Sequence, residues 1–483
     1  MIISNHYERE LNVLHQIITN HPTTLAILSD EMGIPKLTIK GDILKLNAYF
    51  LECTNNKNDL IISSNQGFIT INSIFVDNAI TYFYQLKLFL SNNSSLFRLC
   101  VLFLTNYSIS KQQIIDNLFI SETYLFKLCS QLNDCIAPFN LSVHSSNQIF
   151  KLEGDEICLR LFSYIVLQDF FQGIEWPFDS ETPKINFDNS ESSVSLTKNH
   201  AFYLLSEITK QRFSNSKYLI IKPNSSLYSL MELIQDNYDV SETLKKNFFV
   251  SLPQNIAKSE KIYFNFFTRI FLSDLIPSEA KLRLGRKFEY FNHPACRFSN
   301  EIYSRFSNVS CDSAGSTEKE IYLYYLTIFN VLYSIIGDKY RLFLDLMLPI
   351  PYLNITKNDD YMNIIKTEIH LLFEDKELEK YIAGLLYTIS SSKKETTLKL
   401  YIQMSKVFTN VYIIEKRIQA VFNSKNIIFT NDFSQADIII TDSLEKQSEH
   451  QILFYLDSVN NSSRWLDLMT LIQKKFLEKM GDN

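Results

Sequence analysis

Two short segments near the amino terminus carry lysine and hydroxyl side chains at spacings that suit contact with a nucleic acid. The first contains Lys36, Thr38, Lys40 and Lys45, and the second contains Ser121, Thr123, Tyr124 and Lys127. Lysine ammonium groups neutralise phosphates, and hydroxyl groups bond to phosphate oxygens and base edges. If each set lies on one helix, both helices could meet the major groove of double-stranded DNA. We therefore predict these eight residues as DNA contacts.

The first set lies in a segment that predicts a helix-turn-helix. Residues 7–18 have apolar side chains at helical spacing, residues 23–32 predict a short helix capped by Thr23, and residues 35–47 predict a third helix. Gly33 can take the left-handed conformation of the turn, and a proline opens the third helix, where its missing N–H costs nothing. The third helix should bury Ile39, Ile43 and Leu46 and leave its lysines outside.

Two strands, at residues 60–62 and 68–71, should follow as a wing around residues 63–67. The same order then recurs in a second module. Its expected helices are 96–106, 110–119 and 120–132, with Ser110 and Ser121 as N-caps, and its wing strands are 141–144 and 148–152 around a turn at 145–147. For the first module a structural three-helix bundle with a hairpin stays open as the alternative, because acidic side chains outnumber basic ones in residues 1–60.

Two successive winged helices, followed by Gly154-Asp155-Glu156, Arg160-Leu161-Phe162 and Trp176-Pro177-Phe178, resemble the Mga family of global and virulence transcription regulators, which includes AtxA and MafR-type proteins. The resemblance extends over the whole chain in order and length. It implies two central all-helical domains similar to those that the phosphotransferase system (PTS) phosphorylates on histidine, called PRD-like below, and then a domain like the EIIB component of that system.

The expected fold class is therefore mainly α and multidomain. The expected boundaries are a winged helix at residues 1–72, a second, Mga-type winged helix at 73–165, PRD-like domains at 166–285 and 286–392, and an α/β EIIB-like domain at 393–483.

The resemblance carries the regulatory positions to His200 and His370, with HPr or another PTS phosphocarrier as the implied partner. Histidine suits reversible phosphotransfer because its pKa near 6.5 leaves a neutral, nucleophilic ring nitrogen at cytoplasmic pH. Glu374, one helical turn beyond His370, could hold that ring. A partly buried structural histidine is the alternative for both residues.

The last part of the chain alternates strands and helices. Strands are expected at residues 398–404, 426–430, 436–441 and 451–456, with helices at 410–422 and 463–480. This order predicts a small, mainly parallel sheet covered on both faces. An active EIIB of this type has a phosphorylatable cysteine in the loop after its first strand, but residues 405–408 contain none. The resemblance implies a dimerisation role instead, so we expect a homodimer or higher oligomer.

Composition limits the other function classes. Only 10 Gly and 11 Pro occur, which favours helices, and the net charge of −6 means that DNA binding must be local. The seven cysteines are scattered without a C-x-x-C pair, so we expect neither metal site nor disulfide framework. We expect no cofactor and no enzyme activity, because no phosphate loop or nucleophile–base pair stands at a recognisable spacing.

The chain opens without a secretory signal, and its longest apolar run, residues 321–336, is polar-interrupted and short for a membrane span, so we expect a cytoplasmic protein that does not bind membranes. Two alternatives remain. One is a phosphotransfer protein, and the other is a PTS-regulated RNA-binding antiterminator, which would normally begin with an all-strand domain. For DNA, the absence of an Arg or Asn fork on either helix predicts recognition by shape with low sequence stringency.

Overall fold

The computed structural model describes residues 5–20, 22–64, 67–180, 196–223, 225–244, 248–308, 316–347, 360–391, 397–404, 410–423, 426–443, 451–456 and 461–481. The chain forms two compact units. Unit 1 comprises Met1–Asp359 with Glu368–Leu372, and unit 2 comprises Asp360–Thr367 with Phe373–Asn483. The protein is mainly helical, with a helix-turn-helix domain and a small sheet near its carboxyl end.

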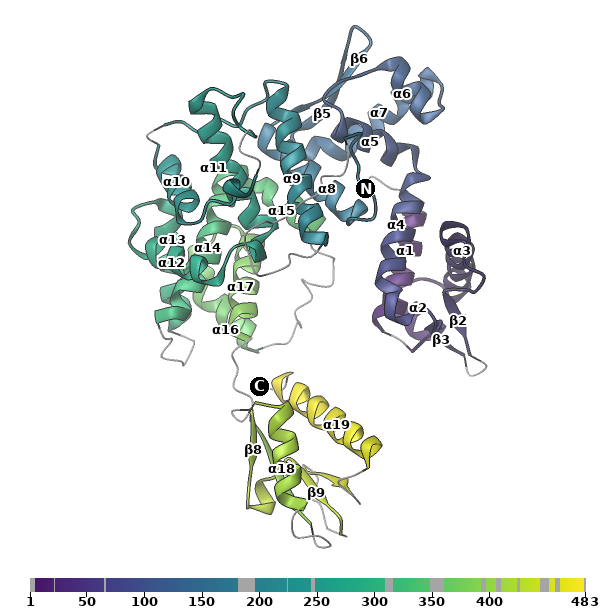
Figure 1. The fold of residues 1–483 in the computed structure, drawn as a ribbon, viewed down its shortest axis with the longest axis vertical. Helices are drawn as coiled ribbons and strands as arrows, with labels where there is room; N and C mark the ends of the chain where they lie inside the picture. The colour runs from purple at the N-terminus through teal and green to yellow at the C-terminus, as the bar shows by residue number, and fades with distance from the viewer. Residues whose placement is uncertain are drawn as a thin grey trace. The chain divides into compact units, whose positions relative to one another are not determined.

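The first module of unit 1 has the predicted helix-turn-helix. Its elements are α1 (Asn5–Thr19), β1 (Thr23–Thr24), α2 (Leu25–Met32), α3 (Lys36–Thr54), β2 (Ile61–Ser63) and β3 (Phe68–Ile71) (Figure 1). Gly33 takes the predicted left-handed conformation with φ 65°. Two details differ. Thr24 rather than Thr23 caps α2, because α2 begins at Leu25, and both threonines pair with β3 in a short strand that we did not predict.

The core of this module confirms the predicted inward face of α3, since Ile39, Ile43 and Leu46 are all buried. The helix continues past the predicted end at Asn47 as far as Thr54. Asn47 itself is buried, and its side chain bonds to both the N–H and the carbonyl of Ile61. These two bonds fasten the wing to α3.

Helix α4 (Ala79–Asn92) joins the two modules after a 3-10 turn, η1 (Val76–Asn78). The second module contains α5 (Ser95–Thr105), β4 (Ile109–Ser110), α6 (Lys111–Leu118), α7 (Glu122–Ile136), η2 (Ala137–Phe139), β5 (Leu141–Ser146), β6 (Ile149–Gly154) and α8 (Glu156–Phe171). Ser110 and Ser121 cap α6 and α7 as predicted. The wing turn lies at Asn147 and Gln148, slightly later than predicted, because both residues have the positive φ of a tight hairpin turn.

The rest of unit 1 is helical. It contains α9 (Leu196–Ser214), α10 (Ser226–Asn237), η3 (Val240–Thr243), α11 (Gln254–Phe271), η4 (Ser273–Leu275), α12 (Ser278–Tyr290), α13 (Pro294–Ser307), α14 (Ser316–Ile336), η5 (Gly337–Lys339) and α15 (Tyr340–Met347). The expected boundaries after residues 165 and 285 fall inside α8 and α12, so neither marks a gap between domains. Glu318–Leu346 is apolar and long enough for a membrane span, but 61% of its apolar stretch is buried inside the protein.

Two expected boundaries involve residues outside the described ranges. Most of the polar linker at residues 179–195 is outside the described residues, as is the start of the predicted last domain after residue 392. Helix α16 (Asp360–Ile369) continues into the 3-10 turn η7 (His370–Leu372), and α17 (Lys376–Ser391) follows.

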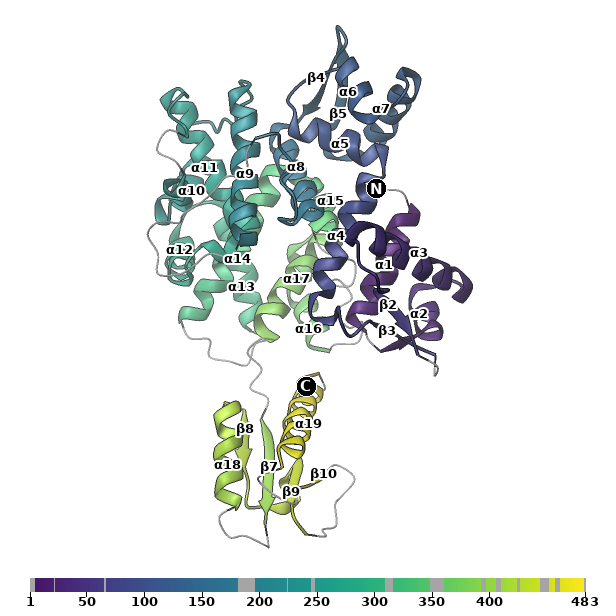
Figure 2. The same ribbon diagram turned by 45° about the vertical axis from the view of Figure 1, so that its right-hand side comes forward.

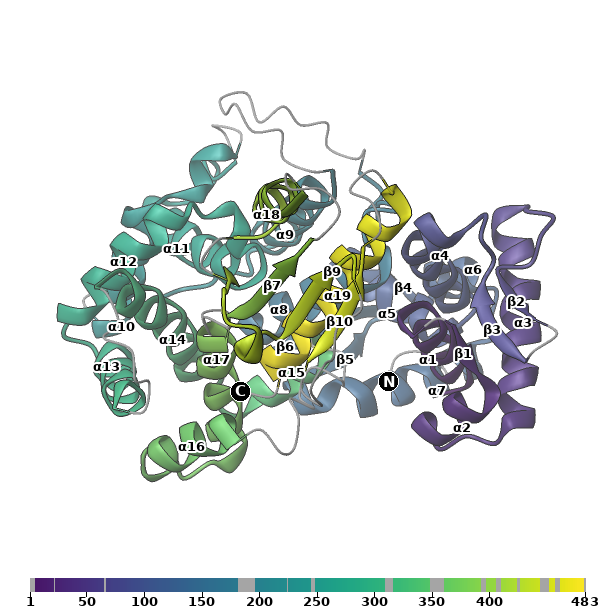
Figure 3. The ribbon, with the colours of Figure 1, turned by 90° about the horizontal axis from the view of Figure 1, so that it is seen from below.

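The carboxyl-terminal sheet of unit 2 has the order β10-β9-β7-β8, and all of its strand pairs are parallel, as predicted. Its strands are β7 (Leu398–Gln403), β8 (Ile427–Phe429), β9 (Ile438–Thr441) and β10 (Ile452–Tyr455). Strands β7, β9 and β10 are seen side by side in Figure 3. The loop at residues 405–408, which lacks the EIIB cysteine, is outside the described residues.

The prediction that helices cover both faces of this sheet is wrong for the described residues. Helices α18 (Asn410–Val421) and α19 (Ser462–Gly481) share one core with the same face of the strands, through Ile414 and Leu468 against Leu400 and Ile438. On the other face, only the short turn η8 (Phe433–Gln435) is described, and Phe433 contacts Tyr401 at 5.4 Å between ring centroids. The chain between β8 and β9 is too short for a covering helix.

Candidate nucleic-acid interface

Helix α7 presents the predicted contact residues on its exposed side. Leu125 and Leu128 face the core, which turns Thr123 and Lys127 outward to solvent. Tyr124 is exposed beside them. The exposed Ser121 caps the helix, because its hydroxyl oxygen accepts the N–H of Tyr124 at 3.3 Å. The first two turns of α7 therefore offer hydroxyl groups and a lysine on one side, next to the positive end of the helix dipole.

The wing lies beside α7 (Figure 2). The N–H of Val143 in β5 donates to the side-chain oxygen of Asn133 in α7 at 2.7 Å. Phe126 of α7 lies near Phe150 of β6, with 6.1 Å between ring centroids. Short strand β4 pairs with β6 and leads directly into α6. Helix and wing thus form one surface whose parts keep a fixed spacing.

The charges of the second module cancel. Between residues 78 and 167 the basic residues are Lys87, Arg98, Lys111, Lys127, Lys151 and Arg160, and the acidic residues are Asp116, Glu122, Asp134, Glu153, Asp155 and Glu156. Several of these are paired: Lys87 with Asp169 at 2.7 Å, and Lys111 with Glu122 at 2.8 Å. Lys127 takes part in no ion pair described for this module, so its charge remains available to a phosphate.

Helix α3 differs from the prediction. Lys36 and Lys40 are exposed, but Thr38 is half-buried and Lys45 donates to the fully buried Glu10 at 3.0 Å. The centre of the exposed face is apolar, with Leu37 82% and Leu44 65% exposed. Lys36 and Lys40 therefore lie along one edge of this face rather than at its centre.

A buried ionic network joins the second module to the central helices. Arg160 of α8 is 2% exposed and binds Glu260 of α11 through two bonds of 2.6 and 2.9 Å. It also donates to Glu156 at 2.8 Å, and Glu156 in turn binds Arg212 of α9 at 2.7 Å. Burial alone would lower the pKa of Arg160, but the two carboxylates raise it above its ordinary value. The wing strand β6 leads straight into this network.

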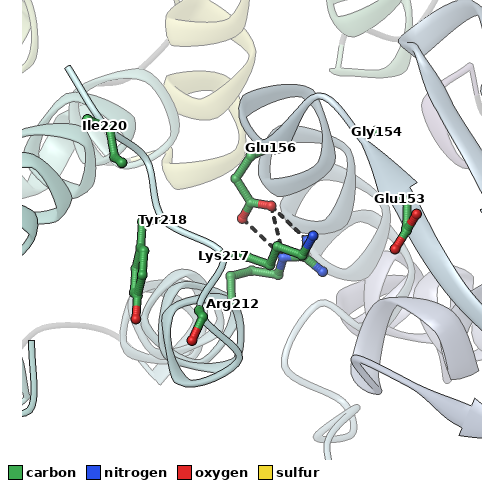
Figure 4. Close-up of a pocket in the computed structure, with 8 residues that line it drawn as sticks. Glu153, Gly154, Glu156, Arg212, Lys217, Tyr218 and Ile220 are labelled. Atoms are coloured by element: carbon green, nitrogen blue, oxygen red, sulfur yellow. Dashed lines mark hydrogen bonds and ion pairs between the residues drawn. The ribbon is translucent and has the colours of Figure 1, made fainter. Parts of the chain in front are cut away.

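A cavity of about 250 Å³ lies beside the network (Figure 4). Glu153 and Glu156 come from the end of β6 and the start of α8, whereas Arg212 and Lys217 come from the end of α9 and the residues after it. The walls of this cavity belong to the wing on one side and to a central helix on the other.

The two predicted regulatory histidines have different surroundings. His200 in α9 lies against Gly173 and 5.3 Å from the ring of Trp176, and neither of its buried ring nitrogens forms a regular hydrogen bond. Burial lowers the pKa of His200. The polar backbone of Glu175 beside the ring raises this pKa and so cancels part of the effect of burial. His370 is exposed in η7. Glu374 does not lie one helical turn beyond it as predicted, because the helix ends before that residue.

Sequence reasoning missed several residues of this surface and its support. Glu260 and Arg160 are 100 positions apart in the chain, and nothing in either segment points to the other. In contrast, the four-then-three spacing of Leu37, Gly41, Leu44 and Ala48 was readable in the sequence. Among the residues that the structure describes, no group of three or more His, Cys, Asp or Glu side chains could hold a metal ion.

Comparison with known proteins bears on the second module. Residues 78–167 match the family model of the Mga helix-turn-helix domain, a stretch that begins just before α4 and ends within α8. No curated protein matches the chain. The match favours a DNA-binding regulator, and it gives no support to the alternatives of an antiterminator or a phosphotransfer protein. Mga proteins are regulators and not an enzyme family. The chain contains an Mga helix-turn-helix domain between residues 78 and 167, and this match supports a regulator of the Mga family.

Proposed function

We propose that this protein is a cytoplasmic transcription regulator that places α7 in the major groove of double-stranded DNA and lays its second wing on the adjoining phosphates. The observation that carries this proposal is the exposed side of α7 within the Mga helix-turn-helix domain. Thr123 and Tyr124 would reach base edges, while Ser121 and Lys127 would bind phosphates. A helix N-terminus favours a phosphate oxygen in the same place.

Sequence stringency should be low. The first turns of α7 expose hydroxyl groups and a lysine, and the exposed amide of Gln131 comes two turns later. Without a two-pronged Arg or Asn contact, discrimination depends on the shape and bending of the duplex. Single base changes across a binding site should therefore have small effects, and steep penalties at defined positions would contradict this.

The central experiment measures binding of the full chain to duplex DNA by fluorescence anisotropy, with an RNA hairpin as competitor. Thr123→Ala combined with Lys127→Ala should weaken DNA binding by about tenfold or more, since each lost contact is worth about 1 kcal/mol or more. Lys222→Ala is the matched control, because Lys222 is an exposed lysine of the central region. Equal losses in both variants, or displacement by the RNA hairpin but not by DNA, would refute the proposal.

Lys36 and Lys40 serve as phosphate contacts at the edge of α3 in this proposal. Thr38 contributes less because it is half-buried, and Lys45 contributes less because it is paired with Glu10. Replacing both edge lysines by alanine should weaken binding evenly across DNA sequences. The slope of log affinity against log salt should flatten by about two, one unit per lost phosphate contact. An unchanged slope would remove α3 from the DNA interface.

Regulation through the PTS is a further part of the proposal. Of the two candidate phosphorylation sites, His370 is the accessible one, while His200 would need the Gly173–Trp176 segment to move aside. Incubation with phosphorylated HPr should give a shifted band on phosphate-affinity gels that His370→Ala removes. No histidine-dependent band would rule this out.

Self-association through the carboxyl-terminal domain completes the proposal. Helix α19 exposes Leu466 (70%) and Leu477 (58%) on the side away from its sheet. Pairing of two chains would double a weak DNA contact. Analytical ultracentrifugation should show at least a dimer at micromolar concentration, and Leu466→Glu with Leu477→Glu should weaken this association.

A further inference from the structure

Helix α3 carries an exposed apolar stripe, Leu37, Gly41, Leu44 and Ala48, which we call the α3 stripe. The two leucines are 82% and 65% exposed, although each is large and apolar. The four residues follow the four-then-three spacing that lets one helix pack along another. The opposite side of α3 already packs in the core of its module, so the α3 stripe is left over as a second packing face.

Gly41 in the middle of this stripe is not required by the fold. It lies inside the helix with ordinary φ, and a side chain added there would meet no atom within 4 Å. A glycine inside a helix costs about 0.8–1 kcal/mol relative to alanine. Its benefit must then come from outside the module, and the absence of a side chain lets another backbone approach closely.

The stripe is complementary to itself. When two copies of α3 are aligned antiparallel, Leu37 lies opposite the partner's Ala48, and Leu44 lies opposite the partner's Gly41. Every layer then pairs one large residue with one small residue, which is how closely packed helices fill space. A two-fold axis produces this arrangement from identical chains. We propose that the α3 stripe binds the α3 stripe of a second copy of this chain in an antiparallel pair.

The flanking charges allow this pairing without driving it. Lys40 and Lys45 lie on the two edges of the stripe. In the antiparallel alignment each is displaced from the same lysine of the second copy by five residues, about 7.5 Å along the helix. Lys45 is already paired with Glu10. The remaining repulsion is screened by salt, so salt should strengthen this contact while it weakens DNA binding. Because salt acts in opposite directions on the α3 contact and on DNA binding, the two can be tested separately. The inference does not rest on the proposed function.

Disulfide trapping in the full chain tests the inference. Leu37→Cys and Ala48→Cys are prepared as separate proteins, and each is oxidised alone and as a mixture. Residues 37 and 48 are about 16 Å apart along α3, so neither cysteine lies near its own copy in the antiparallel pair. Only the mixture should give a disulfide-linked dimer on non-reducing gels, at least tenfold above the background of the unmodified protein and its native cysteines.

A second variant controls for chance collisions. Leu44→Glu puts a charge at an exposed position, so the fold should survive, which a circular dichroism melt checks. Added to both cysteine proteins, it should abolish the cross-link, whereas Leu466→Glu on α19 should leave it in place. The inference is overturned if the mixture gives no cross-link, if the cross-link persists with Leu44→Glu, or if Leu37→Cys links to itself, which would mean a parallel pair.

Discussion

The two winged helices of this chain have the same order of elements but different exposed faces on their third helices. Helix α7 presents Thr123 and Lys127, whereas α3 has Leu37 and Gly41 at the corresponding positions and exposes Leu44 one turn further on. The inward faces follow the same rule of buried aliphatic residues in both. A shared fold therefore does not imply a shared task, because the task depends on the few side chains that the fold leaves outside.

The ion pairs of the two modules differ in the same way. In the first module they stay internal: Arg9 binds the buried Asp42 with two bonds of 2.8 Å and so ties α1 to α3. In the second module Arg160 reaches out to Glu260 on α11. The second module is thus fastened to the central helices, while the first is fastened mainly to itself. Through this network a change in the central helices can reach the second wing directly, whereas no ion pair among the described residues joins the central helices to α3.

The largest effect is expected from a substitution that removes the ion pair between Arg160 and Glu260. Glu260→Ala leaves the guanidinium of Arg160 buried without its main partner, and breaking a buried pair costs about 3–5 kcal/mol. Urea unfolding should show this loss, together with weaker DNA binding because α8 and the wing lose their support. The matched change in the first module is Asp42→Ala, which leaves the guanidinium of Arg9 unpaired but about one third exposed to water. It should cost clearly less, and equal losses would mean that the two modules are fastened alike.

The second expected effect concerns the wing. Gly154 has φ +148°, and a side chain there would come within 2.1 Å of the carbonyl oxygen of Asn140. Gly154→Ala must therefore shift the junction between β6 and α8, at a cost of about 1–3 kcal/mol from the backbone conformation alone. Thermal melts should fall and DNA affinity should fall with them. An unchanged melting temperature would show that this junction is looser than the structure indicates.

Prediction from sequence succeeded where local chemistry decides the structure. Gly33, Ser110 and Ser121 were correctly assigned to a turn and two caps, because each acts on backbone atoms within a few residues. It failed where distant partners decide. The pairing of Lys45 with Glu10 and of Arg160 with Glu260 depends on how whole helices pack, which periodicity does not reveal. On the outward face of α3, Lys36 and Lys40 are exposed as predicted, and Leu37 and Leu44 are exposed beside them.

Gly41→Ala should have a smaller effect on stability than Gly154→Ala, and of opposite sign. Gly41→Ala meets no atom within 4 Å and improves the helix propensity of α3, so it should stabilise the first module by about 0.5–1 kcal/mol. The same methyl group would fill the space that a partner's Leu44 needs, so self-association should weaken while stability rises. Differential scanning calorimetry and sedimentation equilibrium on the same sample check both. A gain in stability with unchanged association would show that the glycine has no role in the contact.

The smallest expected effect concerns how the stability of the protein depends on pH. Burial lowers the pKa of His200 and of His293, whose ring nitrogen caps α13 by accepting the N–H of Ala295 at 3.1 Å. A histidine whose pKa is lower in the folded state binds a proton more readily when unfolded. Its contribution to stability is therefore full above about pH 6.5 and is lost as the pH falls below that value. The melting temperature should drop between pH 7.5 and 5.5. His200→Phe should reduce this drop, because phenylalanine does not titrate and can keep the aromatic contact with Trp176. If the drop is the same in His200→Phe as in the unmodified chain, the acid sensitivity arises elsewhere, and His293→Asn, which keeps a capping oxygen, identifies whether α13 is its source.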